Sequence, residues 1–286
     1  MATDFEEHRS HLLRVGYRIT GSLADAEDAV QEAWFRWSRA SDVREPRAWL
    51  TTVVARICLD RLTSASARRE TYVGPWLPEP LVTAPDDDGP LAAVVRGEDV
   101  RLAAVLLLDR LTPAQRVAFV LHEALGTRYA EIGEVLGCSA DAARQHAAAA
   151  RRSLASAPVP ARAPAATEQR VLAEFGAALA RGDWQAVVSL LHPDITFTSD
   201  GGGRVATALR PLAGADKVGR FLAGLSAKYS FDVSGWTTVL VNGEPGLATP
   251  AADGVAASVT AFTVDADGRI TAARQVMNPD KLRPWW

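Results

Sequence analysis

The chain has 286 residues, of which 48% are hydrophobic and 23% are charged, and its formal net charge at pH 7 is -3. This length and composition predict a globular chain that buries more than one core, and no apolar run is long enough to span a bilayer. The two cysteines, Cys58 and Cys138, form neither a CxxC metal or redox motif nor a disulfide framework. The N-terminus lacks the basic and apolar parts of a secretory signal, which predicts a cytoplasmic protein without a membrane partner.

The charge distribution does not exclude nucleic-acid binding. A phosphate-binding domain is usually basic overall, whereas this chain is slightly acidic. Residues 1–72 nevertheless carry 11 basic and 11 acidic side chains, and the triplet Asp86-Asp87-Asp88 alone matches the net negative charge. A basic stripe can therefore occur on one face of a helix.

Two proline-rich segments interrupt the periodic hydrophobic pattern. Residues 73–91 include the aspartate triplet and several prolines and glycines, and residues 156–166 form a Pro/Ala stretch. Both compositions disfavour regular helix. We therefore expect three ordered domains and two linkers, with the bounds 1–72, 73–101 (linker), 102–155, 156–166 (linker) and 167–286.

The first domain is predicted to be helical. Ser22 begins a capping pattern, and the apolar residues that follow recur at intervals of three and four. Asp28 and Glu32 share a polar face of that helix. A second helix begins after Pro46, with a polar stripe that extends to Arg68-Arg69. A merely solvated helix face is the alternative interpretation of the stripe.

The domain at 102–155 has the spacing of a helix-turn-helix motif. Thr112-Pro113-Ala114-Gln115 predicts a helix start, Gly137 a turn, and Ser139 the cap of the last helix. That helix is expected to turn small apolar residues to the core and to expose Arg144 and Gln145, which suit guanine and adenine in the major groove. A helix pair with a purely structural role is the alternative.

The last domain is predicted to be α+β. An amphipathic helix over about 168–181 and a short helix to Leu191 precede strand-like runs at 195–199, 230–241, 255–264 and 270–276. The sequence Asp265-Ala266-Asp267-Gly268 is a hairpin signal. Helices followed by an antiparallel sheet are typical of that class.

The first two domains resemble extracytoplasmic-function sigma factors. Residues 25–32 (DAEDAVQE) resemble the family's region 2.2, residues 46–62 its regions 2.3 and 2.4, and residues 111–137 its region 4. The resemblance implies two all-α sigma domains, a region 2 bundle and a region 4 helix-turn-helix. It also implies binding to core RNA polymerase, through the β′ coiled coil and the β flap, and to the −10 and −35 elements of promoter DNA. Transcription would be initiated with no cofactor or metal and no enzymatic activity of the chain's own.

The site residues implied by the resemblance form three sets. The core polymerase set is Asp25, Asp28, Gln31 and Glu32. The −10 set is Trp49, Arg56, Asp60, Arg61, Arg68 and Arg69. The −35 set is Ser139, Asp141, Arg144, Gln145, His146, Arg151 and Arg152.

The rest of the chain resembles the subgroup of these sigma factors that carries a fused C-terminal SnoaL-like domain. Three signatures support this: Trp76-Leu77-Pro78-Glu79-Pro80, Asp200-Gly201-Gly202-Gly203-Arg204 and Asn278-Pro279-Asp280-Lys281-Leu282. The resemblance implies a cone-shaped α+β domain that regulates the sigma domains in cis. We expect the second and third signatures to pack on or near the first. An extended proline segment, a tight glycine loop and a simple turn are the alternative interpretations.

Two other functions remain open at the level of sequence. A ligand-sensing repressor would bind DNA through residues 112–154 without polymerase. A SnoaL-like cyclase or isomerase would need a carboxylate base and a donor in an apolar cavity. The candidate bases are Asp194, Asp200 and Asp232, and the candidate donors are His192 and Tyr229. Their spacing places no base beside a donor, and a small ligand of the SnoaL-like domain is left unidentified.

Overall fold

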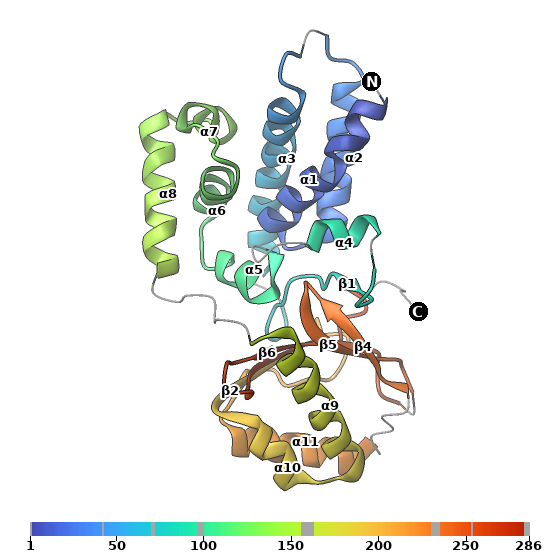
Figure 1. Ribbon diagram of the computed structural model, residues 1–286. Coiled ribbons are helices and arrows are strands. Elements are labelled where there is room, and N and C mark those ends of the chain that lie inside the picture. Colours follow the sequence, from blue (N-terminus) through green and yellow to red (C-terminus); the bar gives the residue numbers. More distant parts are fainter. Residues whose placement is uncertain are drawn as a thin grey trace. The chain divides into compact units, whose positions relative to one another are not determined.

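The computed structural model divides into two compact units, and each is described by itself (Figure 1). The described residues are 2–41, 43–69, 72–87, 89–95, 100–155, 163–229, 235–252 and 254–282. The first unit combines residues 1–71 and 88–159, and the second combines residues 72–87 and 160–286. Most of the proline-rich segment that follows the first domain is therefore part of the second unit.

The first half of the first unit is a helical bundle. Its helices are α1 (Ala2–Thr20), α2 (Leu23–Trp37), α3 (Pro46–Arg69) and the short α4 (Pro90–Val95). As predicted, the Ser22 side chain caps α2 by accepting a hydrogen bond from the Asp25 amide at 3.2 Å. Helices α1 and α2 approach closely because Gly16 lies against Ala26, where a Cβ on the glycine would lie 2.9 Å from the alanine Cβ.

The second half of this unit contains the predicted helix-turn-helix. Its elements are α5 (Leu102–Leu108), α6 (Pro113–Phe119), a π-helical turn (Val120–Ala124), α7 (Tyr129–Leu136) and α8 (Ala140–Ala155). Thr112 and Gln115 form the full capping box of α6. Gly137 ends α7 with a φ of 66°, and the Ser139 hydroxyl accepts the Ala142 amide at the start of α8. These local signals therefore fold as the sequence predicts.

A buried arginine joins the two halves of the first unit. The side chain of Arg116 on α6 is 1% exposed, and its Nε donates to the Arg18 carbonyl of α1 at 3.1 Å. Its Nη1 forms an ion pair with Asp109 at 2.6 Å. Burial of a guanidinium is tolerated here because the charge is paired and hydrogen-bonded.

The second unit is an α+β domain, as predicted, but its sheet is mixed and not antiparallel as the sequence suggested, because one pair of strands is parallel. Its helices are α9 (Ala165–Arg181), α10 (Trp184–Leu190) and α11 (Ala215–Tyr229). Its strands are β1 (Val82–Thr83), β2 (Leu191–Asp200), β3 (Leu212–Ala213), β4 (Thr237–Val241), β5 (Glu244–Thr249), β6 (Ser258–Val264) and β7 (Ile270–Val276). The strand order is β1-β4-β5-β6-β7-β2-β3, and among these pairings β2 with β7 is parallel. Phe175 of α9, Val218 of α11 and Phe262 of β6 belong to the core between helices and sheet.

Several elements of the second unit were not predicted from the sequence. Helix α11 and strands β1, β3 and β5 lie outside the strand-like runs seen in the sequence. Strand β5 contains Pro245 and Gly246, which disfavour a strand when read locally. Gly246 fits because it packs tightly, since a Cβ there would lie 2.5 Å from a methyl group of Val241. Tertiary packing therefore decides this strand.

His11 provides a pH-dependent contact between α1 and α3. Its Nδ1 accepts from Arg47 at 3.2 Å, and its Nε2 lies 3.1 Å from the Thr51 hydroxyl, which itself donates to the Arg47 carbonyl. Burial, together with the charges of Arg47, Arg14 and His8, lowers the pKa of His11 from 6.5 to about 4. The folded protein therefore holds this imidazole neutral.

We expect the Tm of the protein to fall as the pH is lowered from about 6.5 towards 4. The folded pKa of His11 lies below the unfolded value, so the unfolded chain takes up the proton first and the contribution to stability is lost across that window. Thermal unfolding between pH 7.5 and 4.5 would show a smaller decrease for His11→Gln than for the wild type. An identical decrease in both would rule out His11 as a source of the pH dependence.

Candidate functional site

Helix α2 presents the predicted polymerase-docking residues on one exposed face. Gln31 is exposed, and the side chains of Asp28 and Glu32 are 62% and 46% exposed. Glu32 forms an ion pair with Arg36 one turn later. Phe35 is 53% exposed and follows Asp28, Gln31 and Glu32 at helical spacing. Phe35 was not among the predicted docking residues, although its spacing from Asp28 places it on the same face of the helix.

One predicted −10 residue is bound to two predicted docking residues. The Nη1 atom of Arg61 lies 3.0 Å from an Asp25 carboxylate oxygen and 3.2 Å from one of Asp28. The side chain of Arg61 is 30% exposed, so the guanidinium is partly shielded by these contacts. Arg61 therefore ties α3 to α2.

The remaining predicted −10 residues follow helix α3. Trp49 is half-buried and packs against Trp37 with ring centroids 5.9 Å apart. Arg56 and Asp60 are exposed one helical turn apart. The side chains of Arg68 and Arg69 lie outside the described residues.

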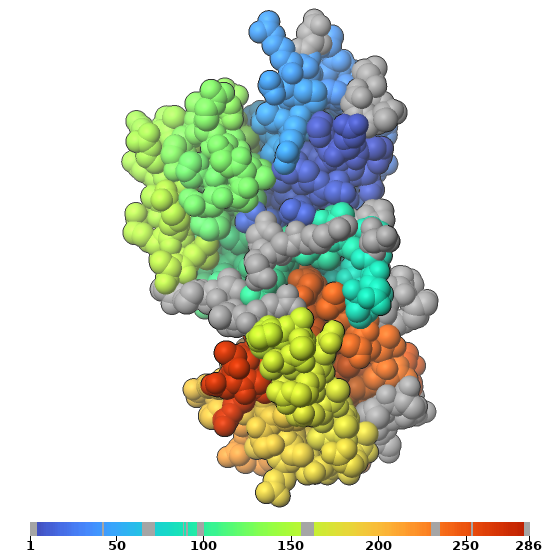
Figure 2. All heavy atoms as spheres, viewed as in Figure 1, coloured from blue at the N-terminus to red at the C-terminus, as the bar shows by residue number. Residues whose placement is uncertain are grey.

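Helix α8 presents most of the predicted −35 residues to solvent, and Figure 2 shows this helix at the surface of the first unit. Its exposed side chains are Ser139 at the cap, Asp141, Arg144, Gln145, Arg151 and Arg152, and His146 is half-buried. Ala143, Ala147 and Ala150 are fully buried on the opposite face. Small buried side chains thus let α8 pack closely while its polar face stays open.

Tyr129 organises two arginines of α8. The Arg144 guanidinium lies 5.5 Å from the centroid of the Tyr129 ring, and Arg151 donates to the Tyr129 hydroxyl at 3.4 Å. The ring stacks on His122 at 4.2 Å, and Arg151 also forms an ion pair with Glu123 at 3.1 Å. Arg151 is thus tied to protein groups, whereas the polar end of Arg144 stays at the surface. No spacing in the sequence links Tyr129 to residues 15 and 22 positions later.

A buried carboxylate in the second unit brings the three signatures together. We call the residues Tyr72, Trp76, Leu77, Asp200, Gly202, Asn278 and Lys281 the clasp. Asp200 is fully buried at the end of β2, and its oxygens accept hydrogen bonds from the Tyr72 hydroxyl at 2.6 Å, the Leu77 amide at 2.8 Å and the Gly202 amide at 3.0 Å. Burial and the nearby Asp200 carboxylate raise the pKa of Tyr72, which keeps its hydroxyl a donor.

Lys281 completes the clasp from the C-terminal signature. Its Nζ atom forms an ion pair with Asp200 at 2.7 Å and donates to the Leu77 carbonyl at 2.6 Å. The same ammonium lies 4.4 Å from the Trp76 ring centroid and 5.0 Å from that of Tyr72. Both backbone groups of Leu77 are therefore bound by side chains more than 120 positions away in the sequence.

The glycines of the second signature allow this close packing. Gly202 and Gly203 have φ values of 60° and 72°, which favour glycine. A Cβ on Gly202 would lie 2.3 Å from the Asn278 amide nitrogen, which donates to the Tyr72 hydroxyl at 2.9 Å. Arg204 and Asp280 form an exposed ion pair at 3.1 Å. The glycine signature is thus a loop pressed against Asn278.

The rest of the first signature is also held by the second unit. Leu77, Pro78, Glu79, Pro80 and Leu81 are buried. Asn242 is fully buried and has a φ of 54°. Its backbone amide donates to the Leu81 carbonyl at 2.8 Å, and its side-chain Oδ1 accepts a hydrogen bond from the Leu81 backbone amide at 3.0 Å. The segment then continues into β1, which pairs with β4. Asn242 was not among the predicted site residues, although Asn242-Gly243 between two apolar runs is a hairpin signal.

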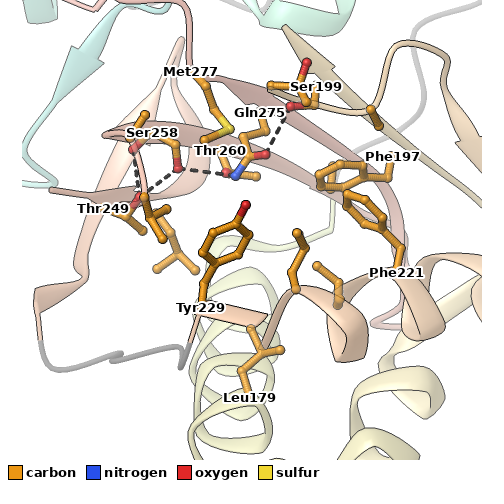
Figure 3. Close-up of a pocket in the computed structure, with 18 of the residues that line it drawn as sticks. Leu179, Phe197, Ser199, Phe221, Tyr229, Thr249, Ser258, Thr260, Gln275 and Met277 are labelled. Atoms are coloured by element: carbon orange, nitrogen blue, oxygen red, sulfur yellow. Dashed lines mark hydrogen bonds between the residues drawn. The ribbon is translucent and has the colours of Figure 1, made fainter. Parts of the chain in front are cut away.

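The candidate catalytic groups of the second unit that the structure describes do not assemble into an acid–base site. A cavity of about 500 Å³ lies between the helices and the sheet, and Tyr229 is one of its lining residues (Figure 3). Asp200 belongs to the clasp, Asp194 is exposed, and Asp232 lies outside the described residues. Among the described residues that line the cavity, none is Asp, Glu or His. His192 is half-buried and does not line it.

Neither a membrane span nor a metal cluster occurs in the described part of the chain. No helix there is long and apolar enough to cross a bilayer. Within the same residues, no group of three or more His, Cys, Asp or Glu side chains could hold a metal ion.

The two helical halves of the first unit match models of a transcription factor class. Residues 5–68 match Sigma-70 region 2, and residues 101–154 match Sigma-70 region 4. The chain is 50% identical over 98% of its length, and 92% of the relative's, to the extracytoplasmic-function (ECF) RNA polymerase sigma factor SigJ of Mycobacterium tuberculosis. It is 33% identical over 97% of its length, and 93% of the relative's, to the probable sigma factor SigI of the same species.

A solved structure agrees with the sequence comparison over both units. The crystal structure of the M. tuberculosis extracytoplasmic-function sigma factor SigJ superposes with a TM-score of 0.82, at 48% identity and 98% coverage of both chains. The chain belongs to the extracytoplasmic-function RNA polymerase sigma factors. Sigma factors bind core RNA polymerase and promoter DNA and are not enzymes, so the family decides against the repressor and cyclase alternatives.

Proposed function

We propose that the C-terminal unit of this sigma factor controls promoter recognition in cis by holding the segment between regions 2 and 4. The observation that carries the proposal is the buried Asp200 carboxylate, which binds both Tyr72 and the Leu77 amide. Residues 72–87 are the covalent connection between helices α3 and α4. A domain that binds this connecting segment limits how far regions 2 and 4 can change their spacing and orientation to match the two promoter elements.

The proposed role of α2 is docking on the β′ coiled coil of core polymerase. Asp28, Gln31, Glu32 and Phe35 supply an exposed face with acidic groups and one aromatic ring. Exposed aromatic side chains beside charged groups are typical of binding hot spots and their rims. Region 4 would contact the β flap, as the family resemblance implies.

The proposed role of α3 is contact with the melted −10 strand. Trp49 offers a partly exposed ring for stacking, and Arg56 offers an exposed guanidinium for phosphates. Arg61 supports α3 from the side of α2 through Asp25 and Asp28. We therefore assign Arg61 a positioning role in addition to any contact with DNA.

The proposed role of α8 is reading the −35 element in the major groove. We expect Arg144→Ala to weaken binding to the −35 element by about 1–3 kcal/mol, the scale of a good contact between a side chain and a base. Holoenzyme binding to promoter fragments with single −35 substitutions measures the effect. Arg170→Ala, an exposed arginine of α9, is the matched control. An unchanged −35 preference in Arg144→Ala would remove this residue from the reading surface.

Run-off transcription tests control in cis. The assay uses purified core polymerase with the full chain and with a chain that ends at residue 162, which keeps both sigma regions. We expect promoter-dependent transcription to differ clearly between the two, while both bind core polymerase. Equal transcription at equal holoenzyme concentration would contradict regulation by the C-terminal unit.

A further inference from the structure

The cavity of the second unit has the size of a small-molecule site. Its volume of about 500 Å³ lies within the range of roughly 300–1,000 Å³ that such sites span. Apolar side chains form most of its lining, including Leu179 of α9, Phe197 of β2 and Phe221 of α11 (Figure 3). Such walls favour an apolar occupant.

One wall of the cavity is polar and crosses four neighbouring strands. The Ser199 hydroxyl of β2 donates to Gln275 of β7 at 3.2 Å, and Gln275 donates to the Ser258 hydroxyl of β6 at 3.3 Å. The Ser258 hydroxyl lies 2.7 Å from that of Thr249 on β5. We call these four side chains the polar wall. Each is ordered by its neighbour, so the wall is preorganised for hydrogen bonding.

Two hydroxyls beside the polar wall can each form a further hydrogen bond. Thr260 lines the cavity from β6, and Figure 3 shows the Tyr229 hydroxyl directed from α11 towards the wall. Within the part of the chain that the structure describes, neither hydroxyl makes a side-chain hydrogen bond. A hydroxyl that faces an apolar space favours an occupant that supplies a partner.

The lining carries almost no charge. Lys228 is the single charged residue among the described residues of the lining; it is exposed, and its ammonium lies 4.8 Å from the Tyr229 ring centroid. A charged ligand would lose its hydration in this cavity without a buried counter-charge. The lining therefore selects against ions.

We propose that this cavity binds a neutral, mainly apolar small molecule with one hydrogen-bonding end. The apolar body lies against α9, α11 and Phe197, and the polar end meets Gln275, Thr260 and Tyr229. The apolar lining, the near absence of charge and the position of the hydrogen-bonding side chains all point to that orientation.

The cavity is also placed to act on the clasp, and this second step rests on the proposed function. Ser199 faces the cavity and the next residue, Asp200, forms the centre of the clasp. Met277 lines the cavity and the next residue, Asn278, binds Tyr72. Successive residues of a strand point to opposite sides, which applies to Ser199 and Asp200 in β2, and the Met277 and Asn278 amides that follow β7 both donate to the Asp200 carbonyl. A ligand that shifts β2 or the residues after β7 therefore also shifts the clasp.

A matched pair of fluorescent probes tests the binding site in the full chain. The neutral probe is N-phenyl-1-naphthylamine, and the anionic probe is 8-anilinonaphthalene-1-sulfonate, which adds a sulfonate to the same skeleton. We expect saturable binding of the neutral probe that is at least about tenfold tighter than that of the anion. Equal or tighter binding of the anion would overturn the proposal, and so would the absence of saturable binding by the neutral probe.

Two variants locate the bound probe. Leu225→Trp fills the cavity from α11 and should weaken binding of the neutral probe at least about tenfold. Thr260→Val removes one hydroxyl at nearly constant side-chain size and should weaken binding of the neutral probe several-fold. The control is Thr196→Val, which changes an exposed threonine of β2 and should leave this binding unchanged. Thermal unfolding checks that each variant is folded. Unchanged binding in a folded Leu225→Trp variant would place the probe elsewhere.

Hydrogen exchange at the Leu77 amide tests the link to the clasp. Saturation with the neutral probe should change the protection of this amide in the wild type and leave it unchanged in Leu225→Trp. Binding without any change at Leu77 would overturn the link while the cavity site stands. A change in transcription on truncation, without probe binding, would support the proposed function and overturn the cavity proposal.

Discussion

Replacing Asp200 by asparagine is expected to weaken the contact of residues 72–87 with the rest of the second unit and to change promoter-dependent transcription. The carboxylate is fully buried and joins Tyr72, the Leu77 amide and Lys281. Removing one partner of a buried ion pair typically costs about 3–5 kcal/mol. The asparagine retains one acceptor, and Lys281 is 14% exposed and can reach water, so we expect the lower end of that range.

The local readout is hydrogen exchange at the Leu77 amide. A loss of about 3 kcal/mol corresponds to about a 100-fold decrease in protection. Asp216→Asn, which alters an exposed aspartate of α11, is the matched control and should leave both exchange and transcription unchanged. The double variant Asp200→Asn/Lys281→Met removes both charges and should be less destabilised than the sum of the single variants. Wild-type protection at Leu77 in a folded Asp200→Asn variant would contradict the role of the carboxylate.

Reversing the charge of Asp28 and Glu32 together is expected to abolish holoenzyme formation. Both side chains belong to the exposed face of α2, so their substitution should cost folding little. Like charges placed against a partner surface cost several kcal/mol, and each 1.4 kcal/mol lowers affinity tenfold. We therefore expect binding to core polymerase to weaken by at least about 100-fold.

The control for this variant is Glu174→Lys/Asp216→Lys, which makes the same change of net charge on exposed sites of the second unit. Co-purification with core polymerase and analytical ultracentrifugation measure complex formation. Arg61 loses Asp28 in the double variant but keeps Asp25, so a small decrease in Tm is expected. Normal yield of the complex with the double variant would show that this face of α2 is not the docking surface.

Local sequence determined several of the helices and their caps. Ser22 and Thr112 cap helices where the sequence places them, because the donor and acceptor of a cap lie within three residues. Ala143, Ala147 and Ala150 are buried because their spacing alone puts them on one side of α8. The sequence motifs were likewise sufficient to identify the family, since regions 2 and 4 are continuous stretches of chain.

Tertiary structure alone decided which residues meet. Nothing local joins Tyr72 to Asn278, 206 positions later, or Arg61 to Asp25 on another helix. Strand β1 had no clear local pattern, and it forms because β4 offers a free edge to a chain held by Asn242. Helix α11 was not predicted, although its apolar residues from Val218 to Leu225 recur at helical spacing. The polar wall of the cavity crosses β5, β6, β7 and β2, whose register follows from pairing between distant strands. Caps and helix faces depend on neighbours in the chain, whereas the clasp and the cavity depend on contacts that exist only after the chain has folded.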